Sequence, residues 1–197
     1  MVKSHVGGLK VNITPLWYVY NGSITVGGET MNNLKSIEFW AALSIIIATV
    51  LLMAAVFLHW IRLSSSLGPF RLNHWMVWIG TLYVAFAVPI IAISKRRYPR
   101  KFLSLVRIHV FGNLAAFLLI SLHFANQISR PPGSYPDLGT GLALYVVMTL
   151  LTATGFVQRF NLAPKIKPQT NRFVHISLAV SFYLIIVVHI MQGIGIL

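Results

Sequence analysis

The stretch Leu105–Gln127, LVRIHVFGNLAAFLLISLHFANQ, decides the fold because it is long and apolar enough to cross a membrane as one helix. A transmembrane helix needs about 20 predominantly apolar residues to span roughly 30 Å of hydrocarbon. Two histidines, His109 and His123, interrupt this run at an interval of 14 residues. Titratable side chains inside a span are costly and usually mark a functional site, so these two rings require an explanation.

Four further apolar runs have the length of a membrane span. Together with the run that contains the stretch above, the five predicted spans are Ile37–Leu63, Phe70–Ser94, Phe102–Gln127, Gly141–Phe160 and Arg172–Leu197. The composition agrees, because 56% of the 197 residues are hydrophobic and only 10% are charged, against about 25% in soluble proteins. The mean hydropathy is +0.75. We therefore predict an all-α integral membrane bundle of five transmembrane helices in residues 37–197.

Residues 1–36 differ in kind from the spans. The segment VNITPLWYVYNGSITVGG, residues 11–28, alternates apolar and polar residues about the turn Asn21-Gly22. This pattern is typical of a small β-hairpin. We expect residues 1–36 to form a cytoplasmic or interfacial segment with a β-hairpin-like flap.

The charge of the chain is strongly positive but does not indicate nucleic-acid binding. Sixteen Lys and Arg residues against three Asp and Glu give a net charge of +13, and they lie in short clusters between apolar runs. Juxtamembrane residues have this distribution, so we reject nucleic acid as a partner. All but Arg62, Arg71 and Arg130 fall on one side of the predicted spans. The positive-inside rule then predicts a multi-pass plasma membrane protein with a cytoplasmic N-terminus and an outer C-terminus.

The sequence contains no cysteine, which restricts the redox chemistry available to it. Disulfides, thiolate-bound metals, iron–sulfur clusters and covalently attached c-type haem all need cysteine. Any redox cofactor must therefore be held by nitrogen ligands or by noncovalent contacts alone.

The last predicted span repeats the histidine interval of the third, since His175 and His189 are also 14 residues apart. Fourteen residues of α-helix rise about 21 Å and return to within roughly 40° of the starting azimuth. The two spans run in the same direction because one crossing separates them. We therefore expect His109 to meet His175 at the cytoplasmic level and His123 to meet His189 at the outer level. Facing imidazoles at two depths can bind two stacked haem irons, each with one axial nitrogen from each helix.

Three glycines are candidate cofactor-binding residues at the same two levels. Gly112 lies one turn after His109, where a missing side chain would let a porphyrin approach the backbone. Gly141 and Gly155 of the fourth span repeat the 14-residue interval and would present two smooth patches. The alternative interpretation is ordinary small-residue packing between membrane helices.

Charged and titratable residues near the ends of the spans add further candidates. Arg107 and Arg172 precede the cytoplasmic-level histidines and Arg130 follows an outer-level one, so all three are candidates to pair with haem propionates. Positive-inside anchoring alone would also explain Arg107 and Arg172. His59 and His74 both fall near the outer surface. A quinone or a metal ion could bind there, although histidines often simply occupy the interface.

Residues 102–197 resemble the di-haem membrane cytochromes b. This group includes the cytochrome b core of quinol:cytochrome c reductases and the ferric-reductase-like transmembrane domains of NADPH oxidases and metalloreductases. The matching motifs are RIH-x13-H from Arg107 to His123, TGFV from Thr154 to Val157 and RFVH-x13-H from Arg172 to His189. The resemblance implies that His109, His123, His175 and His189 are axial haem ligands and that Arg107 and Arg172 lie near propionates. Only 51 residues separate His123 from His175, too few for the extra helices and quinol-site loop of the respiratory subunit, and the sixth span usual in ferric-reductase-like domains is missing.

The predicted function is one-electron transfer across the bilayer by a b-type cytochrome with two noncovalent, bis-histidine haem b groups. Neither a flavin fold nor a nicotinamide fingerprint is present. We therefore expect the electron-transfer subunit of a membrane oxidoreductase complex, exchanging electrons with a quinone or with partner redox subunits. The alternatives are a stand-alone quinone or metal-ion reductase and a small histidine-dependent proton or metal transporter. A transporter would spread polar groups along the helix axis, whereas the sequence between the paired histidines is almost wholly apolar.

Overall fold

The computed structural model describes residues 36–63, 65–68, 70–131 and 139–196. The predicted N-terminal flap lies outside the described residues, apart from Ser36, whose side chain accepts a hydrogen bond from the Phe39 N–H and caps the first helix. The elements are α1 (Ile37–Phe57), β1 (Ser66–Leu67), β2 (Phe70–Arg71), α2 (Leu72–Leu82), η3 (Tyr83–Ala87), α3 (Val88–Arg97), η4 (Pro99–Lys101), α4 (Phe102–Ile128), α5 (Gly139–Phe160) and α6 (Pro168–Gly193). The short strands β1 and β2 pair in an antiparallel ladder.

Five helical segments among the described residues are long and apolar enough to cross a membrane. They are Ile37–Phe57, Leu72–Lys95, Pro99–Ile128, Gly139–Phe160 and Pro168–Gly193. The second segment combines α2, η3 and most of α3, and the third combines η4 with α4. These segments confirm the predicted all-α membrane bundle of five spans.

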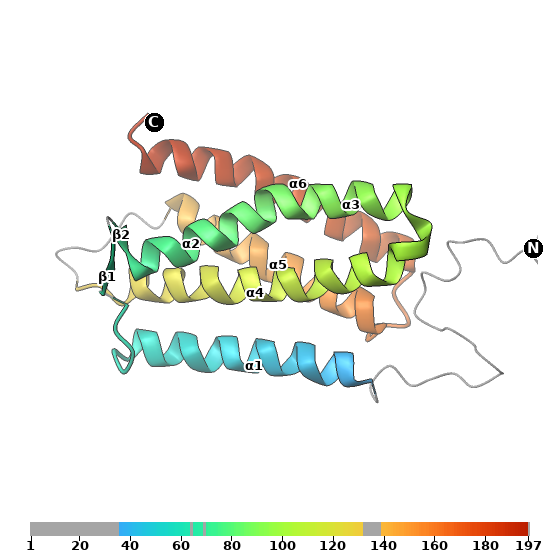
Figure 1. Ribbon diagram of the computed structural model, residues 1–197, viewed down its shortest axis with the longest axis horizontal. Helices are drawn as coiled ribbons and strands as arrows, with labels where there is room; N and C mark the ends of the chain where they lie inside the picture. The colour runs from blue at the N-terminus through green and yellow to red at the C-terminus, as the bar shows by residue number, and fades with distance from the viewer. Residues whose placement is uncertain (1–35, 64, 69, 132–138, 197) are drawn as a thin grey trace, which may run out of the picture.

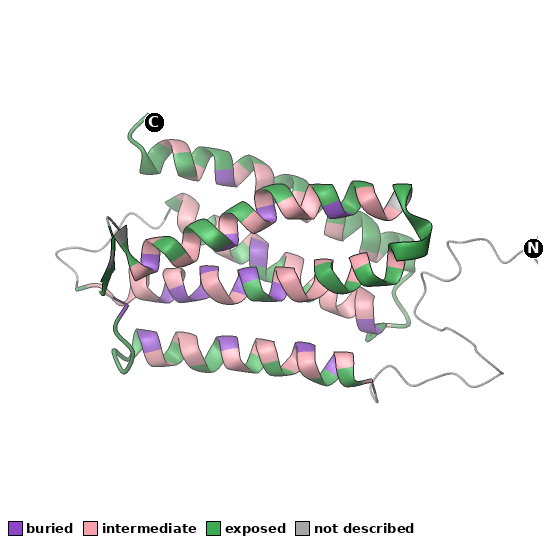
Figure 2. Cartoon of the chain, in the orientation of Figure 1, coloured by how far each residue is buried: buried purple, intermediate pink, exposed green. Residues whose placement is uncertain are grey.

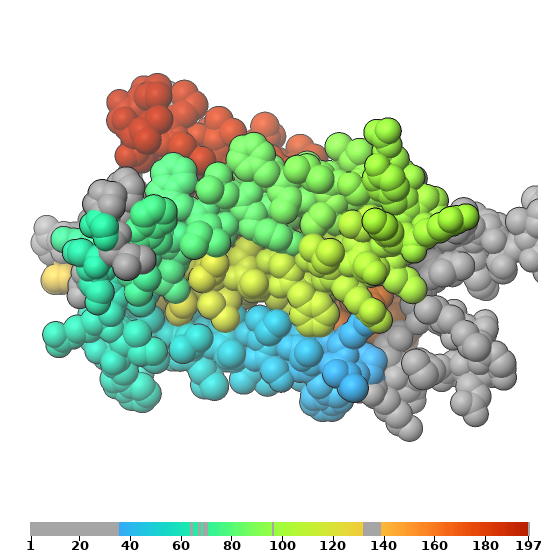
Figure 3. All heavy atoms as spheres, viewed as in Figure 1, coloured from blue at the N-terminus to red at the C-terminus, as the bar shows by residue number. Residues whose placement is uncertain are grey.

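The helices lie side by side in an elongated bundle (Figure 1). Helix α4 packs against α1, α2, α3 and α5, while α6 packs mainly against α5. On the face drawn in Figure 3, α1 lies along one side of α4 and the α2–α3 span along the other. Buried residues are sparse, and exposed residues recur along every helix (Figure 2). Such a surface suits lipid, because lipid tails are as apolar as the side chains they contact.

Most of the described lysines and arginines gather at one end of the bundle, which we call the basic end. It holds the starts of α1, α4 and α6 and the ends of α3 and α5 (Figure 1). Its described cationic residues are Lys95, Arg97, Arg100, Lys101, Arg107, Arg159, Lys165, Lys167 and Arg172. The opposite end carries Arg62, Arg71 and Arg130. The charge asymmetry of the sequence is therefore an asymmetry between the two ends of the folded bundle.

A buried apolar cluster lies midway between the two ends. This middle cluster consists of Val84, Ala116, Phe117, Ile120, Met148, Phe182 and Ile186, so it joins η3, α4, α5 and α6. Ala116 stands midway between His109 and His123 along α4. Phe182, which is 1% exposed, holds the same place between the two histidines of α6. The middle cluster therefore separates the two histidine levels.

The first span is shorter than predicted, because α1 ends before the predicted Leu63. His59 adopts a φ of 60°, in the left-handed region. The N–H of His59 bonds to the Val56 carbonyl and the N–H of Trp60 bonds to the Ala55 carbonyl. These two bonds form a Schellman motif, in which glycine usually takes the left-handed position. His59 therefore terminates α1, and its side chain is exposed.

The second span contains a π-helical turn, η3, that the sequence analysis did not predict. In a π-helix each N–H bonds to the carbonyl five residues earlier, and the Val88 N–H bonds in this way to the first carbonyl of η3. The next residue, Pro89, has no N–H to give to the Val84 carbonyl. The hydroxyl of Tyr183 on α6 donates to that carbonyl instead, at 2.7 Å. Tyr183 therefore satisfies a backbone acceptor that would otherwise lack a partner in the apolar interior.

We expect Tyr183→Phe to lower the free energy of unfolding by about 1 kcal/mol, because it leaves the Val84 carbonyl without its donor. Unfolding by sodium dodecyl sulfate in mixed micelles, followed by circular dichroism, measures the change. Tyr98→Phe is the matched control, since Tyr98 is 51% exposed beyond the end of α3. Equal midpoints for the two variants would show that the bond to Val84 does not stabilise the fold.

Candidate functional site

The four intramembrane histidines form two groups at different depths. Helices α4 and α6 both start at the basic end and run in the same direction (Figure 1). His175 lies within electrostatic range of His109, and both His74 and His189 lie within that range of His123. All four residues are partly buried. We call His109 and His175 the basic-end pair and His123 and His189 the opposite-end pair.

Helix α5 contacts both histidines of α6 through a repeated Thr-Gly dipeptide. The Thr154 hydroxyl lies 3.0 Å from His175 Nδ1, and a Cβ atom added to Gly155 would lie 3.2 Å from His175 Cε1. At the other level, the Thr140 hydroxyl lies 3.1 Å from His189 Nδ1. A Cβ atom added to the following residue, Gly141, would lie 3.4 Å from His189 Cε1. The predicted glycines therefore lie at the two histidine levels, against the edges of the α6 rings.

The α4 histidines have different polar neighbours. His123 Nδ1 lies 3.2 Å from Oδ1 of Asn73, a residue of α2 that is only 2% exposed. His74 and Arg130 also act electrostatically on His123, which places both at the opposite-end level. Near the basic end, Asn113 Nδ2 lies 3.4 Å from His109 Nδ1 and 3.5 Å from its Nε2, so it selects neither ring nitrogen.

Two cationic side chains lie at the level of the basic-end pair. Lys95, at the end of the second span, acts electrostatically on both His109 and His175. Arg172, one of the predicted propionate partners, acts on Lys95 in turn. Two like charges close together favour an anion between or beside them. The structure thus adds Lys95 to the residues named from the sequence.

Arg107 has a partner other than the predicted propionate. Its Nε donates to Glu38 Oε1 at 2.6 Å, and Arg159 donates to the second oxygen of the same carboxylate. Glu38 begins α1, so the two arginines tie α1 to α4 and α5 at the basic end. This role anchors the bundle, and the Arg107 side chain keeps 60% of its surface exposed.

The space beside Gly112 is also filled. A Cβ atom added to Gly112 would lie 1.8 Å from the hydroxyl oxygen of Tyr83 and 2.1 Å from Cζ of the same ring. That hydroxyl donates to the Ile108 carbonyl at 2.8 Å. Gly112 therefore accommodates the Tyr83 ring from η3, where the sequence suggested a porphyrin. Close packing between helices, the alternative interpretation, therefore explains the glycine at this position.

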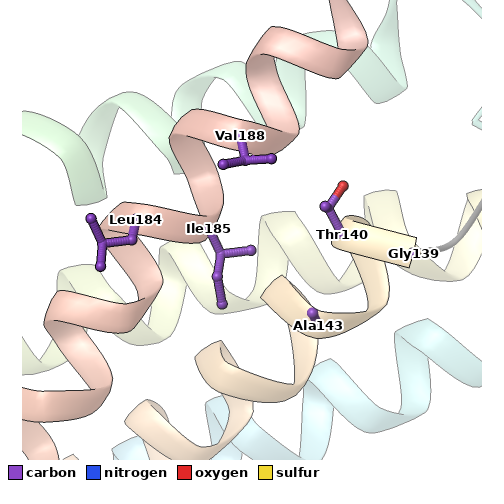
Figure 4. A pocket seen from close by; sticks show the side chains of 6 residues that line it. All are labelled: Gly139, Thr140, Ala143, Leu184, Ile185 and Val188. Atoms are coloured by element: carbon purple, nitrogen blue, oxygen red, sulfur yellow. The ribbon is translucent and has the colours of Figure 1, made fainter. Parts of the chain in front are cut away.

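A shallow apolar hollow of about 310 Å³ lies beside the opposite-end pair. Its lining residues are Gly139, Thr140, Ala143, Leu184, Ile185 and Val188, from the start of α5 and the last turns of α6 (Figure 4). Thr140 is shared between this hollow and His189. Among the described residues, no three His, Asp or Glu side chains come together as a metal-binding group.

Sequence reasoning missed Thr140, Thr154, Asn73 and Lys95. A signal for the two threonines was present, because they repeat the same 14-residue interval as the glycines that follow them. Asn73 and Lys95 carry no such periodicity. Their places at the two levels depend on how the second span packs against α4 and α6, which a sequence pattern does not give.

Comparisons of the chain with protein-family models, with curated proteins and with solved structures returned no match. Fold and site together describe a membrane protein with five candidate spans, in which α4 and α6 each carry two histidines 14 residues apart. The resemblance of residues 102–197 to the di-haem cytochromes b stays a prediction.

Proposed function

We propose that this chain is a b-type di-haem membrane cytochrome that carries electrons across the bilayer. The observation that carries the proposal is that α4 and α6 run in the same direction and each carries two histidines 14 residues apart, His109 and His123 on α4 and His175 and His189 on α6. Fourteen helical residues separate the two levels by about 21 Å along the axis. One pair per level matches the two axial nitrogens that a b-type haem iron takes from a protein.

The residues beside the α6 histidines support a ligand role for these rings. Gly141 and Gly155 remove side chains next to the His189 and His175 rings, where a Cβ atom would already be in van der Waals contact or closer. Helix α6 packs mainly on α5 and meets α4 at the middle cluster, between the two histidine levels. When bound, a haem supplies a one-electron iron couple whose potential depends on its axial ligands and on the burial and charge around it.

The residues of the chain have separable tasks in this proposal. The histidines would hold the irons, and two protein ligands per iron would favour electron transfer over oxygen binding. Lys95 and Arg172 at one level, and Arg130 at the other, offer positive charge to propionates. The apolar middle cluster would keep water out of the region between the levels and so oppose the passage of a hydrated ion.

The membrane setting and the partners follow from the charge asymmetry. The basic end would face the cytoplasm of a plasma-membrane protein, because positive residues remain on that side during insertion. A quinone from the bilayer, or partner redox subunits docked at either end, would then supply and accept the electrons. The chain would act as the electron-transfer subunit of a membrane oxidoreductase complex.

A reduced-minus-oxidised visible spectrum of the purified protein in detergent tests the proposal. We expect b-type absorption bands and about two haems per chain by pyridine haemochrome assay, because each histidine pair binds one. A protein that folds with five spans yet shows no b-type bands when produced with ample haem would contradict the proposal. That result would favour the histidine-dependent transporter, whereas haem together with direct reduction of quinone or ferric chelates would indicate a stand-alone reductase.

A further inference from the structure

We propose that Thr140 and Thr154 are positioning residues that hold His189 and His175 as Nδ1–H tautomers, each with its Nε2 lone pair directed to a metal. The inference rests on the proposed function, because it concerns the ligands of the two haems. It goes beyond that function by assigning the proton on each α6 ring and by naming the side chain that keeps it there.

The direction of the hydrogen bond at Thr154 follows from the single proton of a hydroxyl group. The Thr154 hydroxyl donates to backbone carbonyls of its own helix, 2.9 Å from the Leu150 oxygen and 3.0 Å from the Leu151 oxygen. With that proton used, Oγ1 has only lone pairs to offer to His175 Nδ1, which lies 3.0 Å away. We therefore assign the ring nitrogen as the donor, with the Leu151 carbonyl as a second acceptor at the same ring, and the neutral ring then has its lone pair on Nε2.

The same reasoning applies at the opposite end with a different acceptor. The Thr140 hydroxyl donates to Gln192 Oε1 at 2.6 Å. Its oxygen is therefore an acceptor for His189 Nδ1, at 3.1 Å. Gln192 lies one turn beyond His189 on α6. The hydrogen bonds from Gln192 to Thr140 and from Thr140 to His189 therefore link α6 to α5 and back to α6. The two levels reach the same tautomer by different routes.

Two further observations support this assignment. The amide oxygen of Asn73 can only accept, so His123 Nδ1, 3.2 Å from it, is also a donor. Asn73 is 2% exposed, which shields this bond from water. Gly141 and Gly155 leave room for the α6 rings to approach α5 closely enough for the threonines to reach them. Metal-binding histidines usually donate their second ring N–H to such an acceptor, which fixes ring orientation and raises ligand basicity.

Each threonine should therefore affect one level only. A more basic ligand stabilises the oxidised iron, so loss of the acceptor is expected to raise the midpoint potential of the haem at that level. Weaker orientation of the ring should also weaken haem retention there by roughly 10-fold. The haem at the other level should keep its potential and its occupancy.

The test compares Thr154→Val and Thr140→Val with Thr154→Ser and Thr140→Ser. Valine keeps the shape and removes the hydroxyl, whereas serine keeps it. Thr149→Val is the matched control, because the Thr149 hydroxyl donates to the Tyr145 carbonyl of its own helix. Redox titration followed by visible absorption should show one of the two midpoint potentials raised in each valine variant. Thr154→Val and Thr140→Val should raise different ones. The serine variants and Thr149→Val should keep near wild-type potentials.

A second readout does not need haem. Nitrogen-15 spectra of ring-labelled histidine in the haem-free protein distinguish protonated from unprotonated ring nitrogens. We expect Nδ1–H signals for His175 and His189 in the wild type and a mixture of tautomers at one ring in each valine variant. Unchanged potentials together with unchanged tautomers would overturn the assignment of the threonines. Absence of haem from a protein with the expected nitrogen signals would instead overturn the proposed function and leave the tautomer assignment standing.

Discussion

Replacing His109 and His175 together by leucine is expected to leave about one haem per chain with an unaltered bis-histidine spectrum. Under the proposed function the two residues would bind the same haem, so the variant would empty one level and leave the other intact. Replacing His123 and His189 should likewise leave about one haem, at the other midpoint potential. Replacing His109 and His123 also removes two histidines, but it takes one ligand from each level. Both haems should then lose bis-histidine character.

Pyridine haemochrome assay and electron paramagnetic resonance of the oxidised protein measure these differences. His59→Asn serves as the control, because His59 ends α1 with a left-handed backbone that asparagine also tolerates. It should retain both haems. If the variant that lacks His109 and His123 kept one intact bis-histidine haem, those two histidines would be ligands of the same haem. That result would contradict the pairing of one α4 histidine with one α6 histidine.

Gly112→Ala is expected to lower the free energy of unfolding by about 1–3 kcal/mol, the usual cost of forcing an extra carbon into a packed site. The new Cβ would lie 1.8 Å from the Tyr83 hydroxyl oxygen and 2.1 Å from ring atom Cζ. The ring must therefore move and give up its hydrogen bond to the Ile108 carbonyl. Unfolding by sodium dodecyl sulfate in mixed micelles gives the change in free energy.

The control for this prediction is Gly193→Ala, because an added Cβ there would meet no atom within 4 Å. A second comparison uses Tyr83→Ala as the background, in which the clashing ring is absent. There Gly112→Ala should cost little or even stabilise α4, since alanine favours helix over glycine. A large loss in that background would show that something other than Tyr83 occupies the space.

The five spans could be predicted from the sequence because membrane insertion depends on length and hydropathy, which are local properties. Their exact ends could not, since they depend on backbone geometry. His59 in a left-handed conformation stops α1 before Leu63. The last helix begins at Pro168 instead of Arg172, because proline suits the first turn, where its missing N–H has no partner to lose.

The two histidine levels could be anticipated because α4 and α6 run in the same direction and repeat the same 14-residue interval. The same periodicity places Gly141 and Gly155 against the α6 rings. Contacts made by single long-range partners followed no such rule. Glu38 is 69 residues from Arg107 in sequence, and its ion pair with the Arg107 guanidinium could not be deduced from either span alone. Tyr83 over Gly112 likewise depends on the π-helical turn, which depends in turn on Pro89 and Tyr183.

That π-helical turn sets the direction in which the rest of the second span points. One residue more per turn changes the azimuth of every later residue by about 100° relative to an uninterrupted α-helix. Lys95 comes after η3, and its ammonium group acts on both His109 and His175. In an uninterrupted α-helix of the same sequence, Lys95 would lie about a quarter of a turn around the helix axis from its present position. The irregular turn thus works as an angular spacer that directs the ammonium group of Lys95 to the level of His109 and His175.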